Sequence, residues 1–67
     1  MDYRKTAQEI YDHVGKKANI ISAAHCATRL RLVIADNDKA DKEYVENIDG
    51  VKGVFFAQGQ MQIILGT

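Results

Sequence analysis

Residues 19–34, with the sequence NIISAAHCATRLRLVI, decide the fold of this 67-residue chain. Apolar and polar residues alternate from position 28 to position 34, which is typical of a strand with one buried face. The alternation separates two sets of side chains, Thr28, Leu30, Leu32 and Ile34 on one face and Arg29, Arg31 and Val33 on the other. A strand over 19–25 precedes it, and the tight connection His25-Cys26-Ala27 predicts an antiparallel hairpin.

Two helical segments flank this hairpin. The spacing of apolar residues over 3–14 predicts a helix with one apolar stripe, formed by Tyr3, Ala7, Ile10, Tyr11 and Val14. Asp2 is its expected N-cap, and Gly15 is expected just beyond its end. A second, shorter helix over 41–47 is expected to bury Tyr44, Val45 and Ile48.

The last third of the chain predicts a second hairpin. Strands are expected over 51–57 and 60–65, with Gln58-Gly59 as the turn and a bulge at Gly53. The predicted order is α-β-β-α-β-β in one domain, because a chain of this length holds one small core. This order favours an α+β open-faced sandwich, a four-stranded antiparallel sheet with helices packed on one face and the other face open to partners.

Composition excludes several classes of function. Nine basic and nine acidic residues give a net charge of zero, which argues against a general nucleic-acid binder. One cysteine allows no intramolecular disulfide, and with only His13 and His25 beside it no structural zinc site is expected. No apolar run is long enough to insert into a membrane, and no signal peptide is recognisable. A reducing cytoplasm is the expected compartment.

The candidate chemistry lies in the segment from Cys26 to Arg31. Arg29 and Arg31 are two residues apart on a strand, so their Cα atoms lie about 6.6 Å apart on one face. Guanidinium groups beside a thiol favour the thiolate, the nucleophilic form, and offer paired donors to a tetrahedral oxyanion. Thr28 adds a hydroxyl, and backbone N–H groups of the turn add an anion site. A nucleophile with an anion clamp fits phosphoryl transfer.

Several alternatives remain open from the residues alone. Cys26 can be a buried small hydrophobe, and the arginines can be ordinary exposed charges. His25 can serve as a base or proton relay, or it can point to the face opposite Cys26. Phe55 and Phe56 are consecutive, so one faces the core and the other faces outward, as a docking contact or a singly exposed aromatic.

The segment from His25 to Arg31 closely resembles the active-site signature of the IIB domains of the bacterial phosphoenolpyruvate:sugar phosphotransferase system, in the glucose/sucrose superfamily. The similarity extends over the first helix to Gly15, the pair Asn19-Ile20, and the segments 49–54 and 59–67. Histidine directly before the cysteine is similar to the sucrose, trehalose, N-acetylmuramate and β-glucoside branch.

The resemblance implies a phosphoryl carrier that needs no metal or cofactor. Cys26 would take a phosphoryl group from a histidine of a IIA domain and pass it to a sugar presented by a membrane IIC domain. The phosphate-binding residues implied are Ala27, Thr28, Arg29 and Arg31, with His25 as a possible accessory. The chain is then expected to be the N-terminal IIB part of a longer IIB-IIC polypeptide, at the cytoplasmic face of the membrane.

Rival functions use the same residues differently. In a non-catalytic interaction or regulatory module, Cys26 would be structural. A thioredoxin-like role lacks the second cysteine of Cys-x-x-Cys. A cysteine phosphatase needs a helix N-terminus after the cysteine to bind phosphate, whereas a strand is predicted there.

Overall fold

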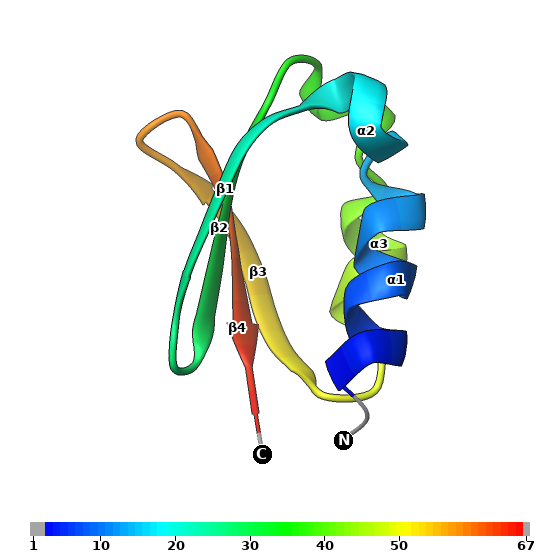
Figure 1. The fold of residues 1–67 in the computed structure, drawn as a ribbon, viewed down its shortest axis with the longest axis vertical. Helices are drawn as coiled ribbons and strands as arrows, with labels where there is room; N and C mark the ends of the chain where they lie inside the picture. Colours follow the sequence, from blue (N-terminus) through cyan, green and yellow to red (C-terminus); the bar gives the residue numbers. More distant parts are fainter. Residues whose placement is uncertain (1–2, 67) are drawn as a thin grey trace.

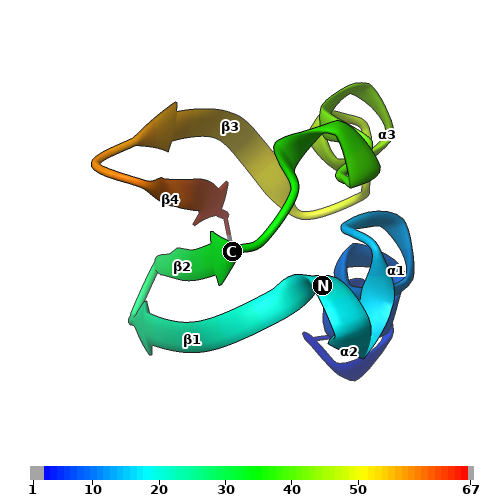
Figure 2. The ribbon, with the colours of Figure 1, turned by 90° about the horizontal axis from the view of Figure 1, so that it is seen from above.

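The computed structural model describes residues 3–66, which form one antiparallel sheet with its helices on one side (Figure 1). In chain order the elements are α1 (Tyr3–His13), α2 (Lys16–Asn19), β1 (Ile20–Cys26), β2 (Arg29–Ile34), the 3-10 helix η1 (Asn37–Lys39), α3 (Lys42–Glu46), β3 (Val51–Ala57) and β4 (Gln60–Leu65). The strands lie in the order β1-β2-β4-β3. Figure 2 shows α1 and α3 on the same side of the sheet, which confirms the predicted open-faced sandwich.

The second hairpin forms as its sequence predicts. Strands β3 and β4 have the expected bounds, and their pairing register shifts between Val51 and Gly53, where a bulge was expected. Gln58 and Gly59 both have positive φ, 56° and 73°. Two such residues between antiparallel strands make the tight turn whose twist matches that of the sheet.

The first hairpin is displaced by one residue from its prediction. Cys26 is the last residue of β1, and the turn consists of Ala27 and Thr28. Thr28, which was expected to share a strand face with Leu30, therefore lies in the turn. Strand β2 keeps the predicted alternation, with Leu32 and Ile34 buried and Arg31 exposed.

The core lies between the helices and the covered face of the sheet. Its buried side chains come from every layer of the fold and are Ile10, Val14, Leu32, Ile34, Val45, Ile48, Val54, Met61 and Ile63. In α3 only Val45 is buried. Ile48, which lies just beyond the end of this helix, is buried as well. The pattern leaves the opposite face of the sheet without a covering layer among the described residues.

Two aromatic residues of the predicted apolar faces are not buried. Tyr44 is 44% exposed, because Val45 and Ile48 occupy the core side of the short helix α3. Its ring stacks instead on His13 at the end of α1, with centroids 3.6 Å apart. Tyr11 and Ala7 of the predicted stripe are also exposed, whereas Ile10 and Val14 are buried. The Tyr3 side chain lies outside the described part of the structure. The predicted N-cap Asp2 lies outside the described residues.

The sequence predicted that Asn19 begins the first strand, but Asn19 is the last residue of α2. Its side chain is buried and joins two segments that are distant in sequence. The Nδ2 group donates to the carbonyl oxygens of Val14, at 2.7 Å, and Asp36, at 2.9 Å. Its Oδ1 accepts from the backbone N–H of Asp36 at 2.8 Å. This one side chain therefore fixes the entry to β1 against the exit from β2.

Gly15 permits the close approach of Asn19. It has φ of 96°, and a Cβ atom placed on it would lie 2.7 Å from the Asn19 Cβ. Gly15→Ala is expected to lower the free energy of unfolding by more than the roughly 1–2 kcal/mol that left-handed backbone strain costs alone. Urea unfolding measures the loss.

Gly59→Ala is the matched control, because Gly59 also has positive φ but has nothing within 4 Å of the added methyl group. Equal losses in the two variants would show that the contact with Asn19 contributes nothing.

Candidate functional site

Cys26 and both arginines of the candidate segment lie on the open face of the sheet. In the pairing of β1 with β2, Cys26 faces Arg29 and Ala24 faces Arg31. Facing residues of antiparallel strands point to the same side of a sheet. Cys26 is exposed, so its burial as a small hydrophobe is wrong. The structure thus brings the thiol and Arg29 to adjacent positions at one end of the first hairpin.

The turn after Cys26 offers backbone donors. Ala27 and Thr28 are both exposed, and within residues 3–66 neither N–H group donates to another backbone group. The Thr28 carbonyl accepts a hydrogen bond of 2.8 Å from the N–H of Leu65, which anchors the turn to the end of β4. A fixed turn with two free N–H groups beside a thiol suits the binding of an anion.

The two arginines have different surroundings. Arg29 Nη1 donates to Gln62 Oε1 at 3.1 Å, and its Cζ lies 5.6 Å from the centroid of the Phe55 ring. Arg31 is exposed, and no hydrogen bond or ion pair holds its side chain within the described part of the chain. Arg29 is therefore fixed by neighbouring strands, whereas Arg31 is free to reach a ligand or partner.

Gln62 is a member of this site whose burial the sequence did not predict. It is 6% exposed although it lies on the open face, opposite Phe55 on one side and Arg31 on the other. Its Nε2 donates to Gln60 Oε1 at 3.3 Å, while its Oε1 accepts from Arg29. The one signal available beforehand was its place in the alternation of β4, two residues from Gln60.

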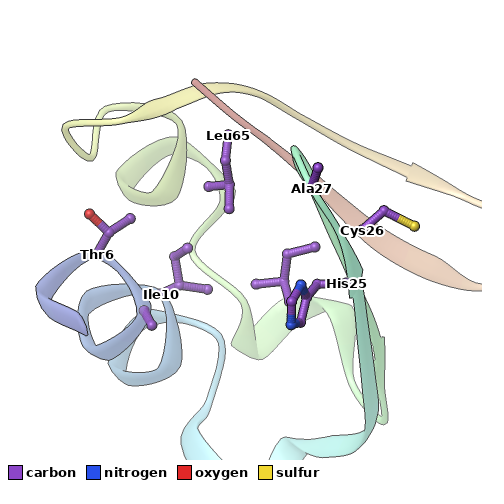
Figure 3. A pocket seen from close by; sticks show the side chains of 8 residues that line it. Thr6, Ile10, His25, Cys26, Ala27 and Leu65 are labelled. Atoms are coloured by element: carbon purple, nitrogen blue, oxygen red, sulfur yellow. The ribbon is translucent and has the colours of Figure 1, made fainter. Parts of the chain in front are cut away.

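His25 lies on the other face of the sheet from Cys26. It faces Leu30 in the pairing with β2, and Figure 3 shows its ring on the helix side while the sulfur of Cys26 points away. The two side chains are therefore separated by the strand itself. Of the two orientations considered for His25, the one opposite to Cys26 is confirmed, which argues against a base acting directly on the thiol.

His25 borders an apolar cleft between α1 and the end of the first hairpin. The cleft has a volume of about 540 Å³ (Figure 3). Its lining residues include Thr6, Ala7, Ile10, His25, Leu30 and Leu65. Cys26 also borders it, but with its sulfur directed to the open face.

Phe55 and Phe56 point to opposite faces, as consecutive strand residues must. Phe55 faces Gln62 on the open face, and Phe56 faces the buried Met61 on the helix side. Phe56 therefore faces the core side of the sheet, as one of the two was expected to, but both rings are 39% exposed and neither is buried. In Figure 1 the turn that follows Phe56 curls away from the helix layer, so the helices do not cover this end of the hairpin.

Among residues 3–66, no three His, Cys, Asp or Glu side chains gather closely enough to hold a metal ion. None of the helices in that range is both long enough and apolar enough to cross a bilayer.

Comparison with known sequences places these features in context. Residues 8–41 match the family model described as phosphotransferase system, EIIB. The whole chain is 60% identical to part of a sucrose-specific EIIBC component from Bacillus subtilis. Over 65 residues it is 43% identical to a trehalose-specific EIIBC component from the same organism. The chain spans 14% of the length of each of these two relatives.

A solved structure is similar throughout the fold. It is the crystal structure of one domain of the phosphotransferase system IIabc component from Clostridium difficile. The two superpose with a TM-score of 0.88 at 52% sequence identity, over 97% of this chain and 67% of that one.

Proposed function

The chain belongs to the EIIB family of the phosphotransferase system, and from this premise we propose that Cys26 is its phosphoryl carrier. Cys26 accepts a phosphoryl group from a phosphohistidine of a IIA domain and passes it to a sugar bound by a IIC domain. The observation that carries the proposal is the exposed thiol at the end of β1, facing Arg29 on the open side of the sheet.

The acceptance step needs a nucleophile, and it needs groups that take up the electron pair of the broken bond and the proton of the thiol. The Cys26 thiolate attacks phosphorus in line, so that the S–P bond forms as the N–P bond of phosphohistidine breaks. The electron pair of that bond remains on the imidazole nitrogen, and the proton released by the thiol is taken up by the imidazole. In the onward step a sugar hydroxyl attacks phosphorus as the S–P bond breaks, and the electron pair of that bond stays on sulfur. The hydroxyl proton passes to the departing sulfur, so that Cys26 is released as the thiol.

The neighbours of Cys26 supply charge and hydrogen bonds to the transferred group. The N–H groups of Ala27 and Thr28 and the Thr28 hydroxyl bind phosphoryl oxygens at the turn. Arg29 and Arg31 neutralise the charge of the equatorial oxygens. Binding that is equally strong before and in the transition state does not speed the onward step. These groups therefore have to bind the phosphoryl group of phosphocysteine more weakly than they bind the transition state.

The larger protein is proposed from the names of the relatives. Those described above are EIIBC components, so we propose that this chain is the IIB part of a longer polypeptide with a IIC domain. The domain then works at the cytoplasmic face of the membrane. Sucrose is the proposed sugar, because relatives at 60% and 54% identity are named sucrose-specific, against 43% for the trehalose-specific one.

The test of acceptance is the intact mass of the domain after incubation with phosphoenolpyruvate, enzyme I, HPr and a IIA protein. The mass is expected to rise by one phosphoryl group, and not to rise when IIA is omitted. No gain with several IIA proteins, for a domain shown to be folded by circular dichroism, would favour a non-catalytic interaction module.

The proposed sugar has a separate test. Membranes that carry either a sucrose-specific or a trehalose-specific IIC domain, each without its own IIB domain, are supplied with the phosphorylated chain and the matching labelled sugar. Sucrose phosphate is expected to form faster, whereas equal rates on matched IIC domains for both sugars would leave sucrose unsupported.

A further inference from the structure

The Arg29 side chain leans across the sheet, away from the strand that carries Cys26. In the strand order β1-β2-β4-β3, Cys26 lies on one edge strand and Arg29 on its neighbour. Both contacts of the Arg29 guanidinium lie on the far side of β2, to Gln62 of β4 and Phe55 of β3. We call Gln62 and Phe55 the arginine cradle.

The cradle holds Arg29 by two independent interactions. Gln62 is almost completely buried, and its Nε2 is engaged by Gln60, so its Oε1 is left to accept from Arg29. The guanidinium carbon lies 5.6 Å from the centroid of the Phe55 ring, within the distance at which a cation is attracted to an aromatic face. This placement of Arg29 therefore stabilises the unphosphorylated domain.

One guanidinium cannot occupy the cradle and serve Cys26 at the same time. Strands β1 and β3 are separated by three strand spacings, roughly 14 Å in all. Arg29 faces Cys26 directly across the hairpin, so rotation of its side chain toward β1 brings it to the thiol. A phosphoryl group on Cys26 would be a strong acceptor for this cation, in competition with the cradle.

We propose that Phe55 is a positioning residue, whose ring competes with the phosphoryl group of Cys26 for Arg29. The proposal rests on the proposed function and adds a consequence to it. Because the ring stabilises the unphosphorylated domain and loses Arg29 on phosphorylation, it makes phosphocysteine a better phosphoryl donor. Phe55 thereby weakens the net binding of the phosphoryl group by Arg29, which favours onward transfer.

The proposal predicts the direction in which substitution of Phe55 shifts the phosphoryl equilibrium. Phe55→Leu removes the ring but keeps an apolar side chain, and it should shift the phosphoryl equilibrium with IIA toward phospho-Cys26 by roughly two- to fivefold. Phe55→Tyr keeps the ring and should behave as the wild type does. Phe56→Leu is the matched control, since Phe56 has the same exposed fraction on the opposite face.

The measurement is the ratio of phosphorylated to unphosphorylated domain at equilibrium with a IIA protein and its phosphohistidine form, read by intact mass. An equilibrium constant depends only on the free end states, so a weakened contact with IIA would change the rate and leave this ratio unaltered. A ratio in Phe55→Leu equal to that of wild type and Phe56→Leu would overturn the proposal. A shift toward unphosphorylated Cys26 would also overturn it.

A second measurement separates this proposal from the carrier function. In the unphosphorylated domain, the ¹⁵N-labelled Arg29 Nε–H signal should carry a ring-current shift that disappears in Phe55→Leu and persists in Phe56→Leu. In the phosphorylated wild type the shift should also disappear. No shift in the wild type, or one that survives phosphorylation, would overturn the proposal that the Phe55 ring and the phosphoryl group compete for Arg29. A wild type that accepts no phosphoryl group would instead refute the carrier function on which the cradle's role rests.

Discussion

Cys26→Ser is expected to abolish phosphoryl acceptance from IIA, by at least about 10³-fold and to below detection by intact mass. A serine hydroxyl is almost wholly protonated at neutral pH, whereas a cysteine supplies a usable fraction of thiolate. His25 does not replace the sulfur, because it points to the other face of the sheet. The assay is the one that measures phosphorylation of the wild type.

The same substitution is expected to leave the fold and the docking surface intact. Cys26 is exposed at the end of an edge strand, so the exchange of sulfur for oxygen removes no core packing. Unchanged unfolding by urea and unchanged IIA binding are the controls. If the serine variant took up the phosphoryl group as fast as the wild type, Cys26 would not be the acceptor.

Asn19→Ala is expected to lower the free energy of unfolding by about 2–4 kcal/mol. The truncation removes three hydrogen bonds and leaves the Val14 carbonyl and both backbone groups of Asp36 without these partners. A domain of this size has a stability on the order of 3–5 kcal/mol. Urea denaturation is therefore expected to show a much lower midpoint than that of the wild type, and no folded baseline if the loss is at the upper end of this range.

Asn47→Ala supplies the matched control for this loss. Asn47 is exposed, and its side chain donates one hydrogen bond, to the Glu43 carbonyl at 2.8 Å. Its truncation is expected to cost under about 1 kcal/mol. Asn19→Ala and Asn47→Ala variants of equal stability would refute the account of Asn19 as the link between the entry to β1 and the exit from β2.

Local signals predicted the second hairpin and missed the start of the first. Strands β3 and β4 were predicted on either side of the Gln58-Gly59 turn, whose two residues adopt positive φ, and such a turn is a property of neighbouring residues. Asn19 was predicted to be in a strand because Ile20 and Ile21 follow it. Its actual place depends on Asp36, seventeen positions away in sequence, whose backbone its side chain binds.

The chemical segment was predictable, but its surroundings were not. Period-two alternation puts Arg29 and Arg31 on one face, and the pairing of the hairpin brings Cys26 to the same face. The contacts of Arg29 depend on β2 lying beside β4, which hairpin patterns do not reveal. Gln62 is 33 positions from Arg29, so no local pattern marked it as a buried hydrogen-bond acceptor.

The most direct test of the central claim is ³¹P and ¹³C NMR of the phosphorylated domain labelled at the cysteine Cβ. The chain has one cysteine, so the label reports on Cys26 alone. The account predicts that phosphorylation moves the Cβ resonance and couples it to phosphorus through sulfur. An unmoved Cβ resonance beside a phosphorus signal coupled to the ring of His13 or His25 would contradict it.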